Sequence, residues 1–125
     1  MTAVVDTLTA TRWQPVCRYD LLQPERGVAA LVDGEQVALF RTHEGDVHAI
    51  GNVDPFSGAA VLSRGIVGDR GGIPMVASPV YKQAFGLRDG RCLDDPEVSV
   101  ARYAARVTDG VVEIAVVDDT ARDGR

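Results

Sequence analysis

Short apolar runs divided by glycine-containing turns constrain this chain more than any other feature. Four turn signals recur along the chain: Asp33-Gly34, Glu44-Gly45-Asp46, Asp89-Gly90 and Asp109-Gly110. Three of them contain Asp-Gly, which is the strongest short hairpin signal that a sequence offers. The apolar residues between them fall in short runs without the period of a helix. The pattern predicts an all-β fold, an antiparallel sandwich or small barrel.

The expected strands follow from these runs. They cover residues 13–17, 27–32, 36–41, 47–50, 73–77, 83–87, 100–107 and 111–117. Residues 18–24 fit a single helical turn that ends at a proline. We expect one domain over residues 13–117, a flexible arm over 1–12 and a polar, frayed tail over 118–125.

Composition narrows the classes of function. The formal charge is −5 and the 13 Lys and Arg residues form no run, which argues against nucleic acid. No apolar run approaches the length of a membrane span, so we expect no membrane partner. The first residues lack a basic flank followed by an apolar stretch, so we expect no secretion signal and a cytoplasmic protein.

Two turn-forming boxes, residues 51–59 and 77–87, each follow a strand-like run and flank a glycine-rich connection. We expect them as loops at one end of the sheets, where β folds often carry function. The layout resembles the cluster-binding end of a Rieske iron–sulfur domain, where a Cys-x-His box and a Cys-x-x-His box hold a two-iron cluster. Here the same positions read Asn52-x-Asp54 and Ser78-x-x-Tyr81. The resemblance makes these four residues vestigial ligand positions.

The chain has two Cys and two His, but none lies in a box; they are Cys17, Cys92, His43 and His48. We therefore expect no metal and no cluster, with both thiols packed as small apolar groups. The histidines flank a turn and are expected to be solvated or strand residues. In place of a cluster, Asn52 and Asp54 would cap backbone N–H groups, and Tyr81 would fill the imidazole space and present its hydroxyl to the facing box.

The box tips also suggest a docking surface, formed by Phe56, Tyr81, Lys82 and Gln83. In the glycine-rich connection, Arg64, Asp69 and Arg70 form either a local ion-pair set, which we favour, or a contact with an acidic partner or a nucleotide phosphate. No phosphate-binding glycine motif with its lysine accompanies them.

Catalytic residues are not expected. Ser57, Ser63 and Ser78 lack a histidine that can be argued to pair with them, and Asp94-Asp95 before a proline indicates a turn. The chain alone is expected to be inactive.

A more specific resemblance covers residues 12–117. It rests on Trp13-x-x-Val16-Cys17, on Gly51-Asn52-Val53-Asp54-Pro55-Phe56-Ser57-Gly58-Ala59, on the stretch 61–70, on Ala77-Ser78-Pro79-Val80-Tyr81-Lys82-Gln83 and on Cys92-Leu93-Asp94-Asp95-Pro96. Together these are similar to the small subunit of the assimilatory NAD(P)H-dependent nitrite reductase.

The resemblance implies a Rieske-like fold without its cluster, acting in nitrate assimilation. It implies a large partner subunit that carries flavin, sirohaem and an iron–sulfur cluster and reduces nitrite to ammonium. This oxidoreductase subunit would bind no cofactor and would dock through Phe56, Arg64, Arg70, Tyr81, Lys82 and Gln83. Two alternatives stay open: an autonomous Rieske-type ferredoxin that carries electrons to an oxygenase, and an unrelated β-domain adaptor.

Overall fold

The computed structural model describes residues 11–117, which form ten strands and two short 3₁₀ turns. In chain order the elements are β1 (Thr11–Arg18), η1 (Tyr19–Leu21), β2 (Arg26–Val32), β3 (Glu35–Arg41), β4 (Val47–Gly51), η2 (Leu62–Arg64), β5 (Ile66–Arg70), β6 (Ile73–Ala77), β7 (Ala84–Gly86), β8 (Arg102–Tyr103), β9 (Ala105–Thr108) and β10 (Val111–Val117). Residues 1–10 of the expected arm and the expected tail over 118–125 lie outside the described residues, whereas Thr11 and Arg12, expected in the arm, belong to β1.

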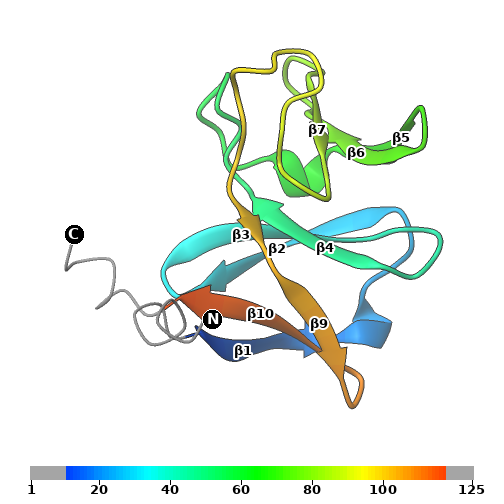
Figure 1. Ribbon diagram of the computed structural model, residues 1–125, viewed down its shortest axis with the longest axis vertical. Coiled ribbons are helices and arrows are strands. Elements are labelled where there is room, and N and C mark those ends of the chain that lie inside the picture. The colour runs from blue at the N-terminus through cyan, green and yellow to red at the C-terminus, as the bar shows by residue number, and fades with distance from the viewer. Residues whose placement is uncertain (1–10, 118–125) are drawn as a thin grey trace, which may run out of the picture.

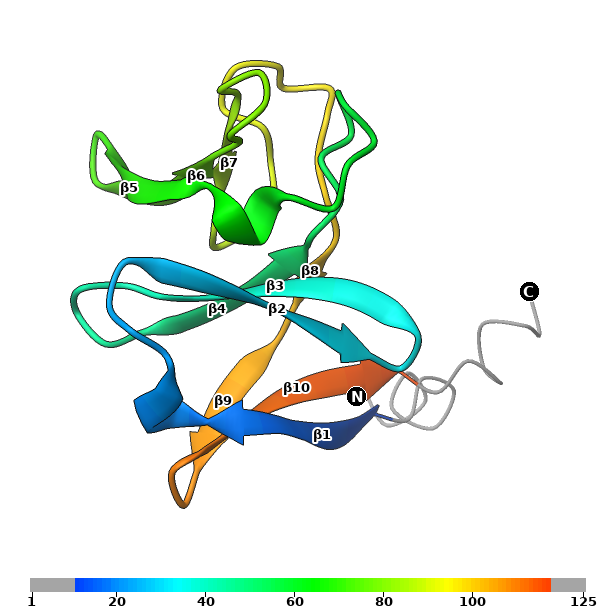
Figure 2. The same cartoon turned by 180° about the vertical axis from the view of Figure 1, so that it is seen from behind.

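The strands form three antiparallel sheets, as the turn pattern predicts. Their orders are β1-β10-β9, β2-β3-β4-β8 and β5-β6-β7. Figure 1 shows the first two sheets packed together in the lower part of the molecule and the third above them; Figure 2 shows the same layers from behind. The all-β, sandwich-like prediction is confirmed. Within residues 11–117 no helix is long and apolar enough to cross a membrane.

Strand β3 holds these layers together because both of its faces are buried. Ala38 and Phe40 join the core between the four-stranded sheet and β5-β6-β7, which we call the upper core. Val37 and Leu39 join the core against β1-β10-β9, which we call the lower core. Successive side chains of a strand point to opposite faces, so a continuous apolar run is what such a central strand requires.

Two of the predicted hairpin turns show the expected backbone. Asp33 and Gly34 have φ of 51° and 83°, and Asp109 and Gly110 have 53° and 80°. Each pair connects strands whose flanking residues are in register, Val32 with Glu35 and Thr108 with Val111. Positive φ at both central residues is the geometry of a type I′ turn, which matches the twist of the strands it joins.

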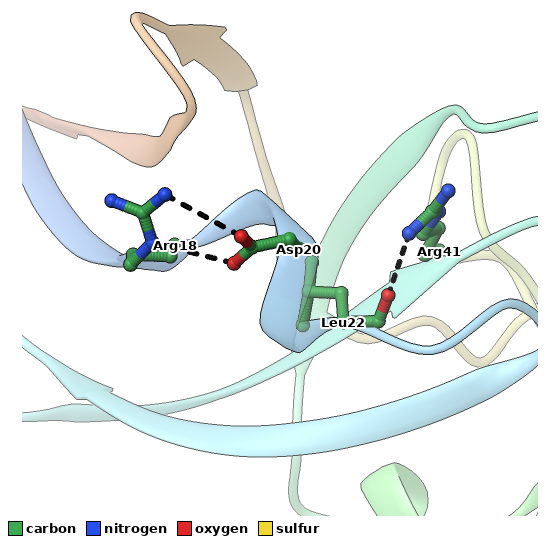
Figure 3. A network of polar contacts seen from close by, with 4 residues as sticks. All are labelled: Arg18, Asp20, Leu22 and Arg41. Carbon is green, nitrogen blue, oxygen red and sulfur yellow. Dashed lines mark hydrogen bonds and ion pairs between the residues drawn. The ribbon is translucent and has the colours of Figure 1, made fainter.

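The predicted helical turn before a proline is confirmed as η1, and its surroundings tie β1 to β3 (Figure 3). The Arg18 guanidinium donates to the Asp20 carboxylate, with N–O distances of 3.4 Å. The Arg41 Nη1 donates to the Leu22 carbonyl at 2.8 Å, and its guanidinium lies 4.4 Å from the centroid of the Tyr19 ring. The Leu22 side chain is buried in the lower core.

Three elements differ from the sequence-based prediction. The glycine-rich connection contains strand β5 and the turn η2, neither of which was predicted. The single strand expected over 100–107 is divided into β8, which pairs with β4, and β9, which pairs with β10. The chain therefore passes from the upper layers to the lower sheet within this segment (Figure 1).

Candidate functional site

The two boxes meet through a buried hydrogen bond. Box 1 (residues 51–59) begins at the end of β4, and box 2 (residues 77–87) leads from the end of β6 through β7. The Ser78 hydroxyl donates to Asp54 Oδ2 at 2.6 Å, and both residues are fully buried. Asp54 Oδ1 accepts a second bond, at 2.8 Å, from the Phe56 N–H, so the carboxylate closes a turn and bridges the boxes together. Such charge-assisted bonds are among the stronger ones in proteins.

Asn52 fixes box 1 to the rest of the upper core. Its Oδ1 accepts the backbone N–H of Ser63 at 2.8 Å, which anchors η2, and its Nδ2 lies 3.5 Å from Gln36 Oε1. The side chain is 1% exposed. The predicted capping of backbone N–H groups by Asn52 and Asp54 is confirmed.

Box 2 is a tight turn organised by Ser78. The Ser78 N–H donates to the Gln83 carbonyl at 2.9 Å, and the Ser78 carbonyl accepts the Lys82 N–H at 3.1 Å. Its hydroxyl oxygen also accepts the Val80 N–H at 3.2 Å. Lys82 takes a φ of 69°, a left-handed value that costs a non-glycine residue some energy. These bonds force Val80, Tyr81 and Lys82 to the tip of the turn.

The expectation that Tyr81 presents its hydroxyl to box 1 is wrong. Tyr81 is 59% exposed, and within residues 11–117 its hydroxyl forms no hydrogen bond. The turn that Ser78 closes carries the ring outward instead. Ser78, not Tyr81, makes the contact with the facing box.

The box residues do not fit a two-iron cluster. The four ligand positions offer an amide, a carboxylate, a hydroxyl and an exposed phenol, where a Rieske centre uses two thiolates and two imidazoles. Asp54 and Ser78 are already bonded to each other. Cys92 packs in the upper core, Cys17 lies on β1, and burial raises the pKa of the Cys17 thiol. Among the described residues, no three His, Cys, Asp or Glu side chains are arranged to hold a metal ion.

The predicted docking residues differ in how far they reach solvent. Tyr81, Lys82 and Arg64 are exposed, whereas Gln83 is half-buried and Phe56 packs against Phe85 with ring centroids 6.2 Å apart. Other exposed apolar side chains near the boxes were not predicted: Val53, Ile66 and Val80. Val53 lies between the buried Asn52 and Asp54, so the alternation of an extended backbone turns it outward.

The ion-pair set expected in the glycine-rich connection is wrong. Arg70 Nη1 bonds Asp94 Oδ1 at 2.9 Å rather than Asp69, and Asp69 Oδ2 accepts the Gly72 N–H of the β5–β6 turn. Asp94 Oδ2 also accepts the Ala84 N–H at 2.8 Å, and that bond, followed by the one from Arg70, lowers the Asp94 pKa. Arg64 forms no ion pair within the described range.

The residues considered for catalysis occupy structural positions. Ser57 Oγ accepts the Ala59 N–H, and the Ser63 backbone bonds Asn52. His43 is exposed beside Glu25, at 3.8 Å, and His48 is a half-buried residue of β4. No hydrogen bond in the described part joins a serine to a histidine. Burial lowers the His48 pKa, Asp46 opposes that shift, and Arg88 and Arg102 add to it.

The three sheets and the paired boxes define the class of Rieske-like domains. Residues 12–115 match the family described as the Rieske-like [2Fe-2S] domain. The nitrite reductase (NADH) small subunit of Salmonella typhimurium is 50% identical over 105 residues, which cover 83% of this chain and 97% of that protein. A crystal structure described as an NADH-dependent nitrite reductase small subunit from Mycobacterium tuberculosis is 64% identical, with a TM-score of 0.84 over 86% of this chain and 97% of that one.

A third relative shows the same domain in a different setting. The nitrite reductase [NAD(P)H] large subunit of Klebsiella oxytoca is 43% identical over 105 residues, which are 84% of this chain but only 11% of that protein. The chain belongs to the nitrite reductase small-subunit family of Rieske-like domains.

Proposed function

We propose that this chain is the cluster-free accessory subunit of an NAD(P)H nitrite reductase and assists a large subunit in reducing nitrite to ammonium. The buried Asp54–Ser78 hydrogen bond is the observation that carries the proposal. It occupies the corner where this class of domain would hold its cluster, and it supplies neither thiolate nor imidazole. A domain of this kind can assist a redox partner without carrying electrons on a cluster of its own.

The Klebsiella relative supports the choice of partner. A domain similar to the whole described chain forms part of one large-subunit polypeptide there. A domain that is covalently joined to a large subunit in one protein fits against a separate large subunit in another. The flavin, the sirohaem and the iron–sulfur cluster would then belong to the partner, the complex would work in the cytoplasm, and this chain alone would be inactive.

An autonomous ferredoxin is the weaker alternative. The relatives near 50% identity are nitrite reductase small subunits, and a ferredoxin requires a bound chromophore. Anaerobically purified protein should be colourless and free of stoichiometric iron and sulfide. Visible absorption bands with bound iron would contradict the proposal.

The docking surface is proposed at the box tips, where Tyr81 and Lys82 reach solvent together with the exposed Val53 and Val80, and Arg64, exposed at the end of η2, would extend it. Phe56 and Gln83 would lie beneath this surface, with Phe56 packed against Phe85. Arg70 would stabilise the edge of the surface through its ion pair with Asp94. Exposed aromatic and apolar side chains beside cations suit a protein contact.

Co-expression with the large subunit tests the function directly. Nitrite turnover with NADH or NADPH should fall when this chain is omitted and return when it is added back. The Tyr81→Ala, Lys82→Gln double variant should lower affinity for the large subunit at least about tenfold, the size expected for removal of an interface anchor.

The matched control is Leu31→Ala. Leu31 is 69% exposed on β2, outside the boxes, so its removal should leave binding unchanged. If the double variant and the control bind alike, the tips are not the docking surface. If the large subunit shows full turnover without this chain, the accessory role itself is contradicted.

A further inference from the structure

A surface pocket lies outside the boxes, beside the strand pair β4 and β8. It has a volume of about 340 Å³, within the range of small-ligand sites. Its lining includes His48 from β4, Arg102 from β8 and Arg88 from the segment that follows β7. The pocket therefore joins the four-stranded sheet to the end of the upper sheet.

Strand register places two of these groups on one sheet face. Ile50 and Arg102 are directly opposed in the β4–β8 pair, so their side chains share a face. His48 lies two residues before Ile50 and points to that same face. Arg88 reaches the pocket from the other layer, directly after Leu87, whose side chain is buried in the upper core.

The two arginines of this pocket are not held in ion pairs by residues 11–117. Neither Arg88 nor Arg102 forms an ion pair there, although the chain as a whole carries −5. Two guanidinium groups around one imidazole disfavour a further positive charge. Burial, Arg88 and Arg102 lower the pKa of His48, while Asp46 raises it.

An adjoining pocket shows where the positive region ends. It shares His48 and Arg88 with the first pocket, but its other charged lining residues are carboxylates: Glu25, Glu44, Asp46 and Asp69. An anion would be repelled on that side. It would be attracted on the side of Arg102, where no carboxylate lines the wall.

We propose that the pocket bounded by Arg88, Arg102 and His48 binds a small free oxyanion of the phosphate, nitrite or carboxylate class. Guanidinium groups present paired N–H donors that match the oxygens of such anions. The inference rests on this pocket alone and is independent of the box tips and of the partner proposed above.

The two histidines make the test direct. In NMR titrations of the isolated full chain at constant ionic strength, inorganic phosphate or nitrite should shift the His48 imidazole signals saturably at millimolar concentration. A bound anion favours the charged imidazole, so the His48 pKa should rise. His43, which is exposed and lies outside this pocket, serves as the internal reference.

Arg88→Gln and Arg102→Gln should each weaken anion binding about tenfold or more, because each removes a charge-assisted contact. Arg91→Gln is the matched control: it removes the same charge from an exposed residue that does not line the pocket. Backbone amide spectra establish that each variant is folded. The absence of a saturable His48 shift with both anions, or equal binding by all three variants, would overturn the proposal.

Discussion

At the scale of single residues, the contact between Asp54 and Ser78 decides what the boxes can do. A buried carboxylate is costly unless its oxygens accept hydrogen bonds, and Asp54 accepts them from the Ser78 hydroxyl and the Phe56 N–H. The bond thus closes the loops and makes the pair part of the fold. Both carboxylate oxygens of Asp54 already accept hydrogen bonds from within the fold, so neither is left open for a metal ion.

Ser78→Ala should therefore lower the free energy of unfolding by about 1.5–3 kcal/mol, the range for a hydrogen bond to a charged group. Urea denaturation followed by circular dichroism measures the change.

Ser57→Ala, in the facing box beside Asp54, is the control. Ser57 Oγ only accepts a 3.2 Å bond from the Ala59 N–H, so its removal should cost less than about 1 kcal/mol. Equal losses in the two variants would show that the bridge between the boxes has no special role in stability.

At the scale of elements, the hairpins were predictable and the glycine-rich connection was not. Asp33-Gly34 and Asp109-Gly110 carry their turn geometry in their own residues, so the strands beside them could be located. Strand β5 was missed because Gly65, Gly68, Gly71 and Gly72 suggest turns, whereas its pairing with β6 is a tertiary contact. Gly65 is required there because a Cβ would collide with the Ala77 carbonyl oxygen.

Some contacts of the boxes were likewise predictable from the sequence, and others were not. The capping by Asn52 and Asp54 follows from their side-chain chemistry and was predicted. The outward position of Tyr81 depends on how Ser78 closes its turn, and the partner of Arg70 is an aspartate 24 residues further along the chain. Local sequence carries no signal for either contact.

Strand β3 makes a prediction about cooperativity. Because its alternate side chains enter both cores, the layers should unfold together. Phe40→Ala, in the upper core, should lower stability by about 3–5 kcal/mol and should shift the unfolding transition of Trp13, which lies on β1 in the lower sheet.

Trp13 fluorescence and circular dichroism, recorded along one urea titration, test this prediction. Coincident midpoints that move together in Phe40→Ala would confirm a single cooperative unit. A Trp13 midpoint that stays at its wild-type value would show that the lower sheets unfold independently.

At the scale of the whole molecule, stability should depend on pH in two separate windows. The first belongs to His48, whose pKa is lowered by burial. The second belongs to Asp94, whose pKa is lowered by its bonds to the Ala84 N–H and to Arg70, and to Glu113, whose pKa is lowered by the bond from Arg106. In both windows the protein loses stability as the pH falls. Near neutral pH the cause is burial of the His48 imidazole, which disfavours its charged form, and in acid the cause is loss of the hydrogen bonds that favour the charged carboxylates.

For the carboxylates, the folded state holds its protons less tightly than the unfolded chain. Their contribution is complete above the ordinary carboxyl pKa of about 4 and is lost as the pH falls through the lower folded values. For His48 the unfolded chain also binds the proton more tightly. Its contribution is complete above the ordinary histidine pKa of about 6.5 and falls as the pH drops below it.

His48→Gln should remove the step that begins near neutral pH and leave the acid step in place. Free energies of unfolding from urea titrations at a series of pH values between about 8 and 3 measure both. His43→Gln is the control, because His43 is exposed and the pH profile should keep its first step.

Phosphate should reduce that step in the wild-type protein if an anion binds beside His48, since the bound charge offsets the cost of protonating a half-buried imidazole. A profile unchanged by His48→Gln would place the source of the first step elsewhere in the molecule.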